Sequence, residues 1–331
     1  MKKRLAAWAA VLLATLLLAA GAAQASTGAT LRLTSLLDPS QSVDASYDLG
    51  ALYAGGGASA GASAGAASAG ATYWWYYDTT YYRMLVPGTS SGPNASYLMW
   101  AYLIDDYLSA AYSSARAVLG ADNGGYGLIN TWLYYDSANR DLLGYYTYGG
   151  NDIHLNLAAS NQSAADYGAT MAHETAHVLF DHKTHLYDRD PVAEAWLTEA
   201  LAYYVGDTVY PYGYNAGYSY NSAVLKYYSD NGAQKSSWYE SGARYDSRGG
   251  YSGATALDQA QVETIGYFLA NYSSEGWGAI QDMVNYLAQG QSIDSALTNA
   301  YGLASGQMGT DSGEGVNTLY SKYIYYYLGH Y

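Results

Sequence analysis

The sequence predicts an α+β protein, in which a small mixed sheet and two long helices are followed by a mainly helical C-terminal subdomain. Three observations support this fold class. Short aromatic or alternating segments, typical of strands, lie before residue 160. Two long segments with apolar residues at three- and four-residue spacing interrupt and follow these strands. Three or four further helical patterns close the chain, and no internal repeat is apparent.

The first 25 residues have the pattern of a secretory signal peptide. Three basic residues at positions 2–4 precede an almost wholly apolar run from Leu5 to Ala20, and Ala23-Gln24-Ala25 supplies a cleavage site of small residues. An uncleaved membrane anchor is the alternative, although the run is short for a membrane span. We therefore expect a chain that starts at Ser26, is secreted or held in a bacterial cell envelope, and keeps no stable membrane insertion.

The composition is acidic and free of cysteine. The 331 residues include 14 basic and 28 acidic ones, which gives a formal net charge of −14. Such a charge argues against nucleic acids and anionic membranes as partners. The absence of cysteine excludes disulfides and a cysteine-linked lipid. Tyrosine is heavily used, with 41 residues against two phenylalanines, and we interpret it mainly as a replacement for phenylalanine.

The region before residue 72 is expected to be separate from the main domain. The segment Leu31–Leu36 is a candidate short strand. Residues 54–71 are nearly all Gly, Ala and Ser, a composition typical of a flexible linker. We therefore predict an N-terminal segment and linker at 26–71 and a single domain at 72–331.

The predicted sheet lies between residues 73 and 157. Residues 73–86 are aromatic and β-branched and favour one or two strands that end at Pro87-Gly88. Further strands are expected at 128–135 and 151–157. In the latter, apolar residues alternate with polar ones, so one face of the strand should be solvated. We expect strand 151–157 to form the edge of the sheet, where an extended substrate or simply solvent would meet it.

A long helix is predicted between the first strands and the later ones. It begins at Pro93-Asn94 and ends at Gly120. Its apolar positions recur at helical spacing, and they are Tyr97, Ala101, Ile104, Leu108, Ala111, Ala115 and Val118.

After residue 160 the pattern is mainly helical. A polar loop at 181–191 separates two predicted helices, of which the second runs from Val192 to about Val205. Residues 206–255 are rich in Gly, Tyr and Ser and predict a long irregular segment, which is more often functional than idle. Closing helices are expected around residues 262–272, 277–287, 293–300 and 316–328.

The first of these helices contains the sequence His173-Glu174-Thr-Ala-His177. Residues four apart lie on one face of a helix, so His173 and His177 can hold one metal ion between them. Glu174 can reach a water bound to that metal, as in the metallopeptidase pattern His-Glu-x-x-His. The chain has six histidines. Four of them lie between residues 173 and 185, which favours a site over a chance pairing on an ordinary buried helix.

A catalytic zinc site needs a third protein ligand. His182 is five residues after His177, which turns it about 140° away from the metal face on a continuing helix. The position six residues after His177 is Lys183, which cannot serve as the third histidine of that pattern. Glu194 and Glu199 on the next predicted helix remain as candidates.

The segment Trp196-Leu-Thr-Glu199-Ala-Leu-Ala-Tyr203-Tyr204 resembles the Trp-Leu-x-Glu-Gly-x-Ala-x-Tyr segment of gluzincin zinc metallopeptidases of the peptidase-MA-like type. The resemblance extends over about residues 80–329. It implies a zincin-like fold, one bound Zn²⁺ with Glu199 as the third ligand beside His173 and His177, and hydrolysis of peptide bonds with Glu174 as general base. The implied partners are protein or peptide substrates.

Two features depart from the family pattern. Glu199 follows His177 at a slightly greater distance than usual, and Ala200 replaces the family's glycine. Gln259 stands where many relatives have a catalytic tyrosine, which leaves the oxyanion-stabilising residue open, with Tyr245 and Tyr251 as candidates. The alternative to an enzyme is a catalytically inactive surface or binding protein with the same fold. A third option is hydrolysis of a non-peptide amide in the cell envelope.

Overall fold

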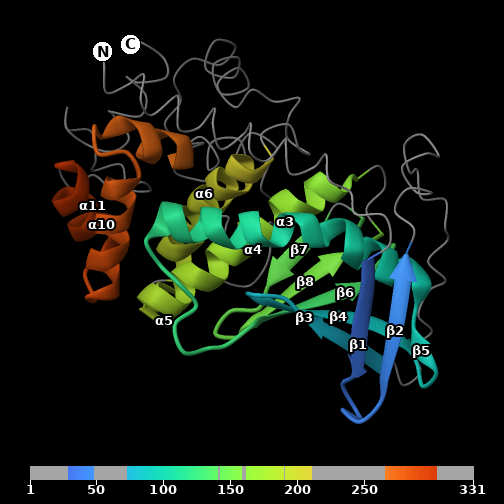
Figure 1. The fold of residues 1–331 in the computed structure, drawn as a ribbon. Coiled ribbons are helices and arrows are strands. Elements are labelled where there is room, and N and C mark those ends of the chain that lie inside the picture. Colours follow the sequence, from blue (N-terminus) through green and yellow to red (C-terminus); the bar gives the residue numbers. More distant parts are fainter. Residues whose placement is uncertain are drawn as a thin grey trace. The chain divides into compact units, whose positions relative to one another are not determined.

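The computed structural model describes residues 29–47, 73–140, 142–158, 162–189, 191–210 and 265–303. These residues form a mixed α/β structure with a mixed sheet (Figure 1). They divide into two compact units, and the chain passes between the units at the end of strand β3 (Tyr73–Asp78), within strand β4 (Tyr82–Thr89) and within helix α3 (Ala95–Leu119). Several predicted features lie outside the described residues: the signal peptide, the linker at 54–71, most of the segment 206–255 with Tyr245 and Tyr251, Gln259 and the helix at 316–328.

The first unit contains the strand order β2-β1-β3-β4. Strand β1 (Ala29–Ser35) pairs antiparallel with β2 (Ser42–Tyr47) and with β3 (Tyr73–Asp78). The predicted short strand is therefore confirmed, and residues 73–86 form two strands. Strand β4 ends at Thr89, one residue after the predicted end at Pro87-Gly88, and its Gly88 pairs with Pro93 of β5 (Gly92–Pro93).

Helix α3 covers the predicted range and buries the predicted face. All seven apolar positions named above are buried. Its start is capped by Asn94, whose side-chain oxygen accepts a hydrogen bond from Ser96 N at 3.0 Å. In the first unit, the Tyr77 hydroxyl donates to the Ala101 carbonyl at 3.2 Å, and the Tyr102 hydroxyl donates to the Ala45 carbonyl at 3.0 Å. The rings of these tyrosines are buried, and their hydroxyls donate hydrogen bonds to main-chain carbonyls of a strand and of the helix.

The second unit contains the order β6-β8-β7. Strand β6 (Ile129–Tyr134) is parallel to β8 (Asp152–Asn156), and β7 (Gly144–Tyr146) is antiparallel to β8. The prediction that strand 151–157 is the sheet edge is wrong, since β8 pairs on both sides and β7 is the outer strand. Alternation of apolar and polar residues reports which face is solvated and not which strand is outermost. Strand β7 has only three residues, which is too short for a strand pattern to be visible in the sequence.

Helix α4 (Ala164–Thr184) contains the two histidines of the metal motif. Ser163 and Asp166 form a capping box, with Ser163 N donating to the Asp166 carboxylate at 2.7 Å. The Tyr82 hydroxyl donates to Thr175 Oγ1 at 2.8 Å inside the core, because the Thr175 hydroxyl itself donates to the Met171 carbonyl at 2.6 Å. Helix α4 is thus capped at its start and tied to β4 at its middle.

The predicted loop at 181–191 is mostly helical. Helix α4 continues to Thr184, and the chain then turns at His185, which has a left-handed φ of 47°. A short helix α5 (Leu186–Arg189) and helix α6 (Pro191–Val209) follow. Proline suits the first position of a helix because it has no N–H to leave unpaired there. Charged residues predicted a loop here, but Asp181 and Lys183 belong to α4, and the exposed Asp188 and Arg189 belong to α5.

The C-terminal part of the second unit is helical, as predicted. Residues 265–272 are helical, and α10 (Trp277–Ala288) and α11 (Ile293–Tyr301) follow. The Arg189 guanidinium donates to the carbonyls of Thr184, Leu287 and Gln291, which joins α5 to the end of α10. Among the described residues, no helix has both the length and the hydropathy that a membrane crossing requires.

We predict that Gly168→Ala destabilises the protein. A Cβ at Gly168 in α4 would lie 2.5 Å from the Tyr107 ring of α3, so one of the two helices must shift. Such overpacking lowers the free energy of unfolding by about 1–3 kcal/mol. Gly278→Ala in α10 is the matched control, because its Cβ would meet only Glu275 at 3.6 Å and alanine favours helix. Urea unfolding measures both variants, and equal stabilities would contradict this packing.

Candidate metal centre

His173 and His177 point to a common position from one face of α4. Their Nε2 atoms are 3.1 Å apart. The side chain of His177 is 4% exposed and that of His173 is 14% exposed. The four-residue spacing therefore brings the two imidazoles together, as the sequence predicted. Both lie where little solvent reaches them.

Helix α6 supplies the third group. Glu199 Oε2 is 3.4 Å from His173 Nε2, and Glu199 Oε1 is 3.5 Å from His177 Nε2. In the described part of the chain these three side chains form a group whose ligand atoms all lie within 4.8 Å of one another. The group can hold a metal ion.

The separations fit a tetrahedral ion. Ligand atoms about 2.0–2.2 Å from a tetrahedral centre lie about 3.3–3.6 Å from one another. The two imidazole nitrogens are 3.1 Å apart, and each is 3.4 or 3.5 Å from a different oxygen of Glu199, so the three groups are at about the spacing that such an ion requires. His177 Nδ1 is buried without a hydrogen-bond partner, so its ring gains polar contact only through Nε2. Three protein ligands would leave a fourth position for water or substrate.

Close helix packing places Glu199 at this distance. Helices α4 and α6 lie side by side (Figure 1). A Cβ at Gly206 of α6 would be 3.1 Å from the Ala169 carbonyl oxygen and 3.6 Å from His173 Cβ. On the other side of α6, a Cβ at Gly266 would overlap the Ala200 carbonyl. Glycine at both positions allows the backbones to approach, which brings the carboxylate to the histidines.

The electrostatics of the two histidines differ. Burial, together with the charge of the neighbouring His173, lowers the pKa of His177 to about 4, against the opposing charges of Glu199 and Asp181. For His173, burial acts downward too, but the hydrogen bond to Glu199 and the charges of Glu174, Glu199 and Asp207 raise its pKa overall. His177 is therefore neutral near pH 7, the form in which imidazole binds metal.

Glu174 lies next to His173 on the same helix and is 6% exposed. Burial raises its pKa to about 7, and the charge of Glu199 acts in the same direction. The charge of His173 and a hydrogen bond from the Tyr146 main chain act the other way. A carboxyl group with a pKa near neutrality can both accept and return a proton at physiological pH.

His182 is not part of the centre. Its Nδ1 is 2.8 Å from Asn123 Oδ1, its Nε2 is 2.8 Å from the Gly150 carbonyl oxygen, and its ring stacks on Tyr126. Both ring nitrogens are therefore engaged away from the metal position. The side chain of Glu194, the other candidate ligand, is not among those that the structure describes, as is the case for Tyr245 and Tyr251.

The structure adds aromatic neighbours that the sequence did not single out. Tyr203 packs edge-on against His173, with ring centroids 4.6 Å apart. Tyr148 lies edge-on to His177 at 6.5 Å and stacks on Tyr187. The spacing of four residues between Glu199 and Tyr203 on one helix is a signal for Tyr203. Tyr148 lies in the β7–β8 turn and has no such local signal.

Comparison with known proteins found no matching family model, no matching curated protein and no matching solved structure.

We predict that the protein binds one metal ion per chain and that Glu199→Ala removes it. Loss of a ligand should weaken metal affinity by more than the roughly 10- to 100-fold that loss of a hydrogen-bond partner of a ligand costs. Glu194→Ala, on the same helix, and His182→Ala are the controls and should keep the metal. Metal analysis after dialysis measures occupancy. Full occupancy in Glu199→Ala, with loss in either control, would show that another residue is the third ligand.

Proposed function

We propose that this chain is a secreted zinc-dependent peptidase with a zincin-like fold. The observation that supports this proposal most is the convergence of His173, His177 and Glu199 beside the buried carboxyl group of Glu174. Two imidazoles and one carboxylate, with an open fourth position, are a ligand set of catalytic zinc sites. A buried glutamate that does not belong to the ligand group but has a pKa near neutrality supplies the acid–base group.

Three of the four residues are proposed to bind the metal, and the fourth to transfer protons. His173, His177 and Glu199 hold the ion, which when bound lowers the pKa of a coordinated water and polarises a carbonyl. Glu174 accepts the proton of the attacking water and delivers it to the leaving amine. The hydrogen bond from the Tyr146 main chain keeps the Glu174 carboxylate oriented from the side of β7.

The order of elements supports the zincin-like fold. A long helix, the strands of a mixed sheet, the helix with the two histidines and the helix with Glu199 follow one another as the gluzincin resemblance implies. The outer strand of the second unit is β7, which contacts α4. We infer that an extended peptide substrate adds its main chain to β7, in place of the strand at 151–157 that the sequence favoured.

The presence of Glu174 favours an enzyme over an inactive binding protein of the same fold. A protein that only binds metal does not need a carboxyl group beside the ligands. Burying a carboxyl group costs free energy, and catalysis would give a reason for it to be there. Glu174 is retained at a position that is 6% exposed, which favours catalysis.

We predict that Glu174→Gln keeps the metal but loses turnover. The amide is nearly isosteric and cannot accept a proton, so the rate should fall by roughly 10²–10⁴-fold. Glu275→Gln, at an exposed position, is the matched control and should be unaffected. Metal content and hydrolysis of a generic protein substrate are measured on the same preparations. Equal rates in Glu174→Gln and the parent would refute the mechanism, and a metal-loaded parent without peptidase activity would favour a binding protein.

A further inference from the structure

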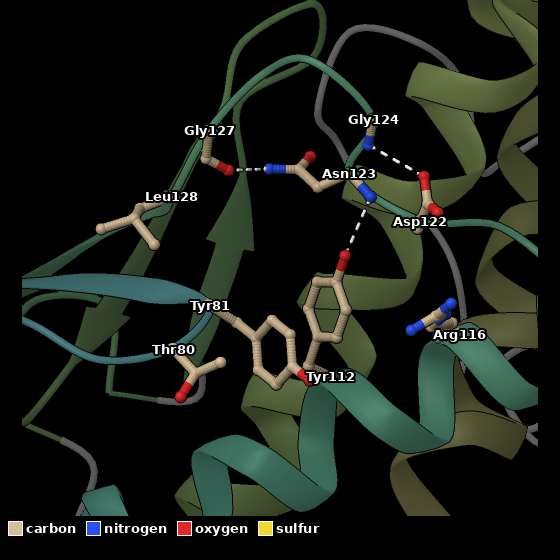
Figure 2. A pocket seen from close by; sticks show the side chains of 9 residues that line it. All are labelled: Thr80, Tyr81, Tyr112, Arg116, Asp122, Asn123, Gly124, Gly127 and Leu128. Carbon is tan, nitrogen blue, oxygen red and sulfur yellow. Dashed lines mark hydrogen bonds between the residues drawn. The ribbon is translucent and has the colours of Figure 1, made fainter.

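A second pocket, which shares no lining residue with the metal centre, lies in the second unit (Figure 2). Its volume is about 430 Å³, within the range of roughly 300–1,000 Å³ that small-molecule sites occupy. Three segments form it: the turn before β4, the second half of α3, and residues 122–128, which follow α3. No part of the proposed peptidase mechanism uses this pocket.

One wall of the pocket is aromatic and fixed. The rings of Tyr81 and Tyr112 stack at 3.9 Å with an interplanar angle of 3°. The Tyr112 hydroxyl accepts a hydrogen bond from Asn123 N at 2.9 Å, so this ring is fixed at its polar end too. Leu128 adds an apolar side chain to the lining. This wall suits a flat apolar group such as an aromatic ring.

The rim is held by side-chain hydrogen bonds. Asn123 is 6% exposed, and its amide nitrogen donates to the Gly127 carbonyl at 2.5 Å and to Asn151 Oδ1 at 3.2 Å. Its amide oxygen faces His182 Nδ1 at 2.8 Å. Residues 122–128 are therefore anchored to α4 and to the start of β8, and the pocket has a rigid rim.

Two exposed side chains of opposite charge line the open side of the pocket, and they do not pair with each other. Within the described part of the chain, the Arg116 guanidinium has neither an ion pair nor a side-chain hydrogen bond, and Asp122 uses one oxygen to accept from Gly124 N at 3.0 Å. Arg83, by contrast, pairs with Asp78 at 2.7 Å. In the view of Figure 2, Arg116 and Asp122 are on one side of the tyrosine pair and Leu128 is on the other.

We propose that this pocket binds a free aromatic α-amino acid. Arg116 receives the carboxylate, for which the planar guanidinium fork is suited. Asp122 receives the ammonium group, and the ring packs against Tyr81, Tyr112 and Leu128. A phosphate or another dianion fits less well, because the Asp122 carboxylate repels it and the chain has a net charge of −14. A neutral aromatic compound would leave both charged groups without partners.

Titration calorimetry of the full chain with L-phenylalanine tests this proposal. We expect one site per chain with a Kd of about 1 mM or tighter, unchanged when zinc is removed by a chelator. N-acetyl-L-phenylalanine lacks the cationic group and L-phenylalaninamide lacks the anionic one. Each should bind about two- to fivefold more weakly, the usual effect of losing one exposed ion pair.

Arg116→Gln and Asp122→Asn should each weaken L-phenylalanine binding by about two- to fivefold. Arg140→Gln and Asp188→Asn, at exposed positions outside the pocket, are the controls and should leave it unchanged. Circular dichroism checks that every variant is folded. Absence of saturable binding, equal affinities in the pocket variants and the parent, or loss of binding on zinc removal would each overturn the proposal. The last result would assign the amino acid to the metal centre.

Discussion

The close packing of α4 against α6 is the constraint on which the candidate site depends. Two imidazoles on one helix supply only two of the three ligands. The third must come from another helix whose backbone packs closely against the first. Gly206 lets α6 approach Ala169 and His173, and Gly266 lets the following helix support α6 at Ala200. A side chain at either position would push α6 against its neighbours and shift Glu199 relative to the histidines.

Helix α4 links this packing to the rest of the second unit. Near its middle it presents His173, Glu174 and His177, and near its end Asp181 accepts hydrogen bonds from the Tyr146 hydroxyl at 2.6 Å and from Gly149 N at 3.0 Å. His182 holds residues 122–128 through Asn123. One helix therefore fixes the ligands, the hairpin that orients Glu174 and the rim of the second pocket, so displacement of α4 would disturb all three.

Local patterns could be predicted from the sequence, and long-range pairings could not. The face of α3 and the spacing of His173 and His177 follow from helical periodicity alone. The sheet edge was assigned wrongly, because the three residues of β7 carry no detectable alternation. The charged residues after Asp181 indicated a loop, although they extend α4 and form α5. Residue spacing alone does not show whether Glu194 or Glu199 is the third ligand. The second pocket has no signal in the sequence, because Tyr81, Tyr112 and Asp122 come together only after folding.

The most direct test of the central claim is a crystal structure of the zinc-loaded protein with anomalous diffraction at the zinc edge. The account predicts one peak per chain, about 2.0–2.2 Å from His173 Nε2, His177 Nε2 and a Glu199 carboxylate oxygen, with water or another small ligand completing the tetrahedron. A peak that is bound by other residues, or no peak at these three side chains in zinc-saturated crystals, would contradict it.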